Sequence, residues 1–267
     1  MKSLRMLGAL SACLVALGLV AGCGTSTHSV APGTTVDQGT ADDFAVQALA
    51  SLDVVSGDMQ VAIGGTPSAP AMSARVAPAR AMWDTTYTTS NGLTYSASRT
   101  FYDDTDTPLP GWSPSAVRLH WTSTASGTAA GPVDTATVGH ASVVDARGIQ
   151  AGQDTLRFDG ACLDTLLNRF RSLDGTRTRH FYWTSSLDIA AVRILKSTLQ
   201  TSGRPIGGTV TFVVSADRLR SNVRTDVEVH FDATVVVVFN DTGTADITVN
   251  STYHYLWNLQ TGAVVRA

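Results

Sequence analysis

Two histidines and an aspartate near the C-terminus have side chains that can bind a metal ion. Residues 224–240 alternate apolar and polar side chains, and residues 245–260 follow nearly the same pattern. If the two stretches form a hairpin with matched apolar faces, His230 lies opposite His254 on the wet face, beside Asp232. Such a set can hold zinc or copper. A solvated polar face is the simpler interpretation, so we predict no metal or other cofactor and keep these three residues as the candidate ligands.

The sequence contains none of the familiar catalytic motifs. It lacks G-x-S-x-G, S-x-x-K, H-E-x-x-H and the phosphate-binding G-x-x-x-x-G-K. Cys162 is the only cysteine beyond residue 23, and a lone cysteine is more often a small buried residue than a nucleophile. We predict that the chain is not an enzyme. A hydrolase whose Ser, His and Asp come from distant positions stays open as a third hypothesis.

An acidic loop and a neighbouring apolar tip could each bind something. Asp103, Asp104 and Asp106 offer oxygen ligands for calcium, but the spacing of an EF-hand is missing, so we interpret them as turn-capping residues. Trp112 ends the stretch Pro-Leu-Pro-Gly-Trp, and we expect it to fold back over the sheet because large aromatic side chains are usually buried.

The charged residues indicate a fold with few helices. Glu228 is the only glutamate, and Lys196 is the only lysine after residue 2. Glutamate and lysine favour helices, whereas aspartate favours caps and turns. The full chain has a formal net charge of −3, which becomes −5 if Lys2 and Arg5 are removed with an N-terminal signal. Nucleic-acid binding requires a basic surface, so we exclude it.

The periodicity predicts one helix followed by strands. Phe44, Ala48, Leu49, Leu52 and Val55 recur at helical spacing within residues 41–55. Residues 64–80 contain three prolines and predict a loop. From residue 81 the period changes to two, and Asn91-Gly92 is a strong hairpin signal between two such stretches.

We therefore predict a mainly β chain with about ten strands. Long antiparallel strands twist and curl, so we expect a large curved or barrel-like sheet with the amphipathic helix packed on it. The predicted parts are a signal at 1–22, a flexible tether at 23–40, the helix and loop at 41–80, and the β domain at 81–267. We expect residues 41–267 to form one domain.

The N-terminal segment has the features of an export signal. Lys2 and Arg5 precede the uncharged residues 6–22, which end in small side chains. The four residues that end at Cys23, Val-Ala-Gly-Cys, resemble the lipobox of bacterial lipoproteins. The resemblance implies cleavage before Cys23, acylation of its thiol and anchoring to a membrane. Gly24 follows the cysteine, and by the proteobacterial pattern this favours the outer membrane, with the chain facing the periplasm or the cell surface.

These observations predict a location more firmly than an activity. A helix on a curled antiparallel sheet is loosely similar to the lipoprotein-carrier and mycobacterial lipid-carrier folds, in architecture only. We therefore expect a cell-envelope lipoprotein that binds a lipid or another hydrophobic ligand. The alternative is an assembly or surface-interaction protein without a ligand. The sequence identifies no protein partner.

Overall fold

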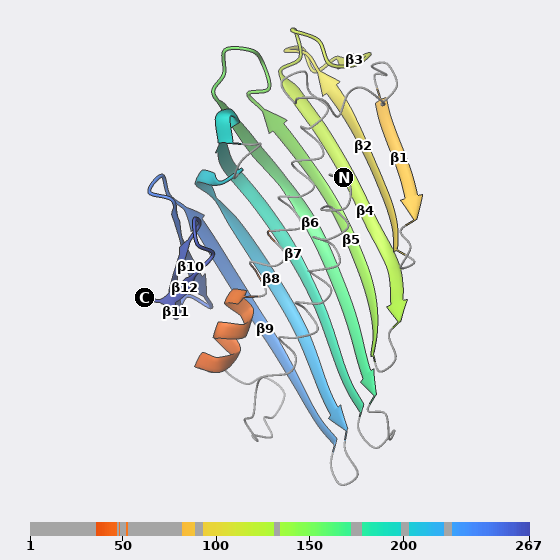
Figure 1. Cartoon of the computed structure of the whole chain (residues 1–267), viewed down its shortest axis with the longest axis vertical. Coiled ribbons are helices and arrows are strands. Elements are labelled where there is room, and N and C mark those ends of the chain that lie inside the picture. Colours follow the sequence, from red (N-terminus) through yellow and green to blue (C-terminus); the bar gives the residue numbers. More distant parts are fainter. Residues whose placement is uncertain are drawn as a thin grey trace.

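Strands make up most of the described chain, as the sequence predicts. The computed structural model describes residues 36–46, 48, 52, 82–88, 93–130, 134–171, 178–198, 203–221 and 226–267. Within them, one large antiparallel sheet surrounds a hydrophobic core, and a helix near the N-terminus packs on it (Figure 1). The prediction of a mainly β fold with a curved sheet and an N-terminal helix is confirmed.

Twelve strands follow one another along the chain. They are β1 (Met82–Thr88), β2 (Leu93–Tyr102), β3 (Pro108–Leu109), β4 (Arg118–Ala130), β5 (Asp134–Arg147), β6 (Thr155–Arg171), β7 (Thr178–Leu195), β8 (Pro205–Ser221), β9 (Asp226–Phe239), β10 (Thr244–Val249), β11 (Tyr253–Asn258) and β12 (Val264–Arg266). A short 3-10 helix, η1 (Lys196–Thr198), follows β7.

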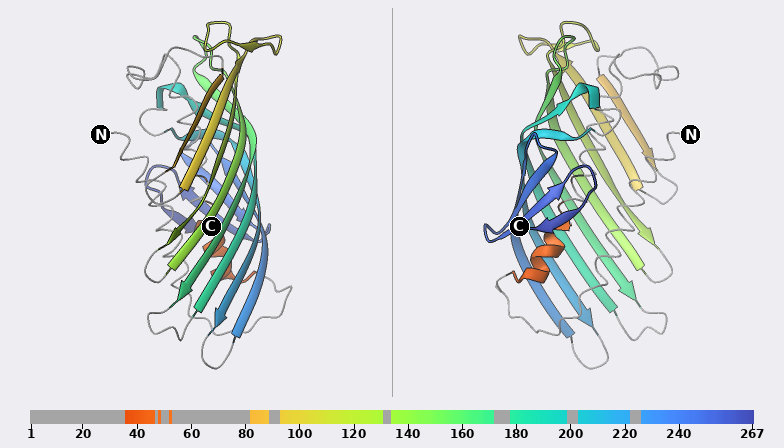
Figure 2. Two further views of the ribbon diagram at one scale, coloured as in Figure 1. Left: turned by 90° about the vertical axis from the view of Figure 1, so that its right-hand side faces the viewer. Right: turned by 60° about the vertical axis from the view of Figure 1, so that its left-hand side comes forward.

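The sheet is an open meander. Its order is β1-β2-β4-β5-β6-β7-β8-β9-β10-β11-β12, with β3 attached to β2. The end strands β1 and β12 do not pair with each other, so the described sheet is not closed into a barrel. The longest strand, β7, has 18 residues, and strands of this length accumulate the twist that curls a sheet. Figure 2 shows this curvature, with the short strands β10–β12 turned away from the direction of the long ones.

Alternate side chains along each strand face a buried inner side and an exposed outer side. On β8, Val210, Phe212 and Val214 are at most 2% exposed, whereas Val213 between them is 55% exposed. The same alternation along β2 to β10 gathers aliphatic and aromatic side chains on the inner face. Burying one such side chain contributes roughly 1.5–3 kcal/mol, so the inner face is the main source of stability.

A β-bulge changes the alternation along β7. Its buried side chains lie at odd positions up to Ile189 and at even positions from Val192 onward. Ala191 in the bulge has a φ of 52°, and its N–H donates to Asp159 Oδ1 at 2.8 Å. Because bulges increase the local bend of a strand, this one helps to curl the sheet.

The helix begins earlier than the apolar pattern predicts. Its described residues are 38–46, 48 and 52, whereas the pattern predicts residues 41–55. Asp37 caps the helix, because its Oδ1 accepts a hydrogen bond from Thr40 N at 2.8 Å. Residues 38–40, at the C-terminal end of the predicted tether, are therefore part of the helix, and residues 23–35 lie outside the described residues.

The apolar side of the helix packs on the inner face of the sheet. The ring of Phe44 lies 5.6 Å from that of Trp183 on β7 and 6.2 Å from that of Phe231 on β9. Leu49 and Val55, two positions of the predicted apolar stripe, lie outside the described residues. The described positions of that stripe are all buried, namely Phe44, Ala48 and Leu52.

Polar contacts join the helix to β11 and β12. Asp42 Oδ1 accepts hydrogen bonds from Tyr255 Oη at 2.9 Å and from Arg266 Nε at 3.1 Å, and Asp42 Oδ2 pairs with Arg266 Nη2. Gln38 Nε2 donates to Tyr255 Oη at 2.9 Å. We call these four residues the Asp42 clasp. The hydrogen bond from Arg266 is the main reason why the pKa of Asp42 lies below its ordinary value.

The Asp42 clasp predicts a contribution to stability that depends on pH. Because the pKa of Asp42 is lower in the folded chain, its carboxylate stabilises the fold above the unfolded-state pKa, and this contribution is lost as the pH falls through the folded-state pKa. The carboxylate is screened by solvent, so we expect Asp42→Asn to lower the free energy of unfolding by only about 0.5–1 kcal/mol at neutral pH. We expect a smaller difference at about pH 2, because protonation of Asp42 weakens the clasp in the parent protein as the pH falls through the folded-state pKa.

Urea unfolding of the parent and the Asp42→Asn variant at both pH values measures this contribution. An equal loss of stability at both pH values would contradict the assignment to an ionised clasp.

Candidate functional site

The structure corrects the predicted contact between His230 and His254. Ala245 on β10 lies opposite Phe239 on β9, which is the register that the sequence predicts. The chain then reverses after β10, and β11 returns along the other side of β10. His254 consequently faces Thr248, one strand further from β9, and does not lie opposite His230.

Asn250 causes this reversal. Asn250 and Ser251 have φ values of 50° and 55°, in the left-handed region that ends a strand. The side chain of Asn250 holds the turn against β9, because its Oδ1 accepts a hydrogen bond from Thr234 N at 2.7 Å. Asparagine tolerates this backbone conformation better than most residues, so Asn250 favours a turn at this position.

His230 lies instead between two aspartates on the outer face. Its Nδ1 is 2.5 Å from Asp217 Oδ1, and its Nε2 is 3.1 Å from Asp232 Oδ2. Asp217 and then Asp232 raise the pKa of His230 above its ordinary value. Both ring nitrogens of His230 therefore lie within hydrogen-bond distance of a carboxylate oxygen. In the described ranges, no three His, Cys, Asp or Glu side chains are arranged to hold a metal ion.

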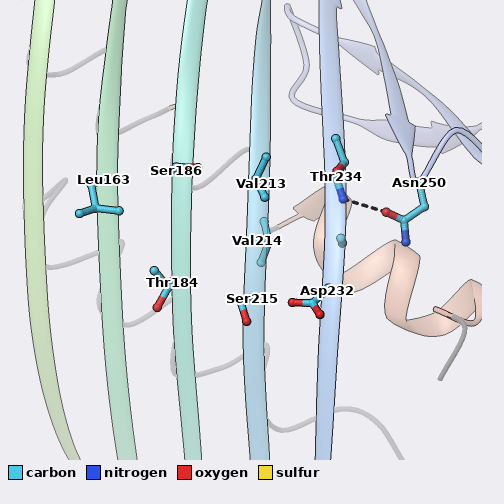
Figure 3. A pocket seen from close by; sticks show the side chains of 10 residues that line it. Leu163, Thr184, Ser186, Val213, Val214, Ser215, Asp232, Thr234 and Asn250 are labelled. Atoms are coloured by element: carbon cyan, nitrogen blue, oxygen red, sulfur yellow. Dashed lines mark hydrogen bonds between the residues drawn. The ribbon is translucent and has the colours of Figure 1, made fainter. Parts of the chain in front are cut away.

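The outer face also carries an open depression over β6 to β9 (Figure 3). Leu163 and Val213 line it and are 49% and 55% exposed, and Asp232 is its charged group. Its volume is about 580 Å³, and hydroxyl side chains lie between these residues. An open surface of this kind buries little of a small ligand, so it suits contact with another protein better than small-molecule binding.

The other sequence candidates have structural roles. Cys162 is buried on the inner face of β6. Asp103 Oδ1 accepts hydrogen bonds from Thr105 N and Thr107 N, both at 2.9 Å, which confirms turn capping. Trp112 packs against the core, as predicted.

A hydrogen-bonded histidine and aspartate lie on the inner face, among mostly apolar side chains. His140 Nδ1 on β5 donates to Asp164 Oδ1 on β6 at 2.6 Å. Their side chains are only 9% and 18% exposed. Both residues have even numbers, like the buried inner-face residues of their strands, such as Val144 and Leu166. A polar residue at an inner position is the signal that could have identified this pair in the sequence.

More polar side chains surround this pair. Asp164 faces Ser185 on β7, which is completely buried and accepts a hydrogen bond from Trp183 Nε1 at 3.1 Å. One inner row further along the sheet, the hydroxyls of Ser123 and Ser142 lie 2.6 Å apart, and both serines are buried. We call these five residues the inner polar cluster: Ser123, His140, Ser142, Asp164 and Ser185.

The inner polar cluster does not have the geometry of a Ser–His–Asp triad. In such a triad the histidine lies between the serine and the aspartate. Here Asp164 lies between His140 on β5 and Ser185 on β7. Two strand spacings, roughly 10 Å, therefore separate the imidazole from this hydroxyl. The arrangement offers hydrogen bonds inside an apolar face, which is typical of a binding site.

Among the residues that the structure describes, no helix has the length and hydrophobicity needed to span a membrane. Cys23, the predicted lipid-attachment residue, lies outside the described residues. Comparisons of this chain with protein-family models, with curated proteins and with solved structures found no match.

Proposed function

We propose that this chain is an exported lipoprotein of a bacterial envelope that binds a hydrophobic ligand against the inner face of its sheet. One observation carries the ligand proposal. The curved, open sheet gathers its apolar side chains on one face, and that face includes a small polar cluster. Binding sites for small molecules are mostly apolar and contain a few well-placed polar groups.

The inner face is shielded from solvent. Val144, Leu187 and Phe212 are at most 3% exposed. A ligand therefore reaches these side chains only if an element that covers them moves aside. The described helix is one such element, held by the packing of Phe44 and by the Asp42 clasp.

The N-terminal segment supports the envelope location. An apolar export signal that ends in a lipobox-like sequence is typical of lipoproteins, and more than one acyl chain gives stable anchoring. The outer membrane remains our proposed location, on the basis of Gly24. A hydrophobic ligand is available to a protein that is held at a membrane surface.

Quenching of tryptophan fluorescence by a brominated alkyl chain tests the proposed site. Trp121 and Trp183 are buried on the inner face, so a bound chain brings bromine close to them. We expect saturable quenching at about one long-chain dibromoalcohol per chain, using residues 24–267, which include every described residue. We expect Trp183→Phe to reduce the quenching, and the outer-face control Val213→Ala to leave it unchanged. Absence of quenching in folded protein would contradict the proposal.

A further inference from the structure

Asp164 presents an unused hydrogen-bond acceptor on the inner face. Asp164 Oδ1 accepts the hydrogen bond from His140 Nδ1. Asp164 Oδ2 is buried and has no hydrogen-bond partner within the described part of the chain. A buried acceptor without a partner is unfavourable, so a group that donates to it is favoured at this position.

The surroundings of Asp164 determine which donors can reach it. Its inner-face neighbours along β6 are Cys162 and Leu166, both buried. Across the sheet, Leu166 faces Trp183. A molecule at this position would place its polar end at the carboxylate and extend its apolar part along the sheet. The ligand is therefore amphipathic.

We propose that the ligand is a long-chain lipid whose polar end carries a hydroxyl group, and that this hydroxyl donates to Asp164 Oδ2. This inference rests on the proposed function and specifies the ligand class of the same site. A hydroxyl can donate to Oδ2 while the bond from His140 to Oδ1 persists. A fatty-acid carboxylate offers no donor, so free fatty acids fit this site less well.

The test compares two probes that differ only in the donor. One is a dibrominated long-chain alcohol, and the other is its methyl ether, which keeps the chain and the oxygen but loses the O–H. We expect the parent protein to bind the alcohol about tenfold more tightly, the effect of one additional hydrogen bond to Asp164 Oδ2. Asp164→Asn can turn an amide N–H₂ towards the ligand in place of the acceptor, so we expect this preference to disappear.

Asp188→Asn is the matched control. Asp188 lies on β7, in the same sheet, and its exposed side chain faces outward, so this variant should keep the tenfold preference. Circular dichroism establishes that each variant is folded.

The outcomes separate the inference from the proposed function. If the parent protein binds the alcohol and the ether equally well, the hydroxyl assignment is wrong and hydrophobic binding stands. This result does not depend on whether Asp164→Asn folds. If the preference persists in folded Asp164→Asn protein, the acceptor is not Asp164. If neither probe binds folded parent protein, the proposed function itself fails.

Discussion

Cys23→Ser is expected to abolish the lipid anchoring of the protein. The thiol of Cys23 is the only group in the lipobox-like sequence that can form a thioether with a lipid, and serine removes it. Among the described residues, no helix is long and apolar enough to span a membrane in place of the acyl chains. Membrane fractionation should place the acylated parent protein in the membrane. The variant should be either soluble or held in the membrane only by its uncleaved signal.

Cys162→Ser provides the matched control for this change. It makes the same substitution at a buried position of the sheet, so the protein should stay with the membrane. The intact mass of the parent protein should correspond to a chain that begins at Cys23 and carries acyl groups. A parent protein that is not acylated, or a variant that stays in the membrane with its signal removed, would contradict the anchor.

Gly208→Ala is expected to cause the largest loss of stability among single substitutions in the described sheet that we consider. Gly208 on β8 has a φ of 100°, a conformation that alanine adopts only with strain. An added Cβ would lie 2.4 Å from both the carbonyl oxygen of Ala191 and the Cα of Val192. These are backbone atoms of the β7 bulge, so they cannot move aside without disturbing the bend of the sheet. We expect a loss of about 3–5 kcal/mol.

Gly262→Ala separates backbone strain from steric conflict. Gly262 also has a positive φ, 74°, but an added Cβ there would meet no atom within 4 Å. We therefore expect a loss of about 1–2 kcal/mol, from the backbone conformation alone. Urea unfolding measures both variants. Equal losses would show that the close approach of β8 to the bulge does not constrain the fold.

The sequence predicts the strands well because one face of the sheet is apolar. In β8 and β9, period-two alternation continues for many residues, and the pairing of Phe239 with Ala245 follows from matching the apolar faces. The helix is also predictable, since Phe44 belongs to a helical stripe. Its start is harder to predict, because the cap, Asp37, lies in a polar segment whose composition is typical of a tether.

The candidate sites were harder to predict because they depend on single residues. Asn250 interrupts an alternating stretch and redirects β11, which separates His254 from His230. His140 and Asp164 are polar residues at inner positions of β5 and β6, so they weaken the period-two pattern of these strands. Nothing in the sequence indicates that the two side chains contact each other. Their contact requires the register between the two strands, which weak alternation does not define.

The most direct test of the central claim is mass spectrometry of an organic extract from purified protein of residues 24–267, produced in a bacterial periplasm. We predict a lipid in about one-to-one ratio with the chain, because binding on the inner face buries a large apolar surface. A hydroxyl-bearing lipid would also support the assignment to Asp164. An empty extract from folded protein would contradict the ligand proposal. It would favour a packed core and a surface-interaction role that uses the outer depression around Leu163 and Val213.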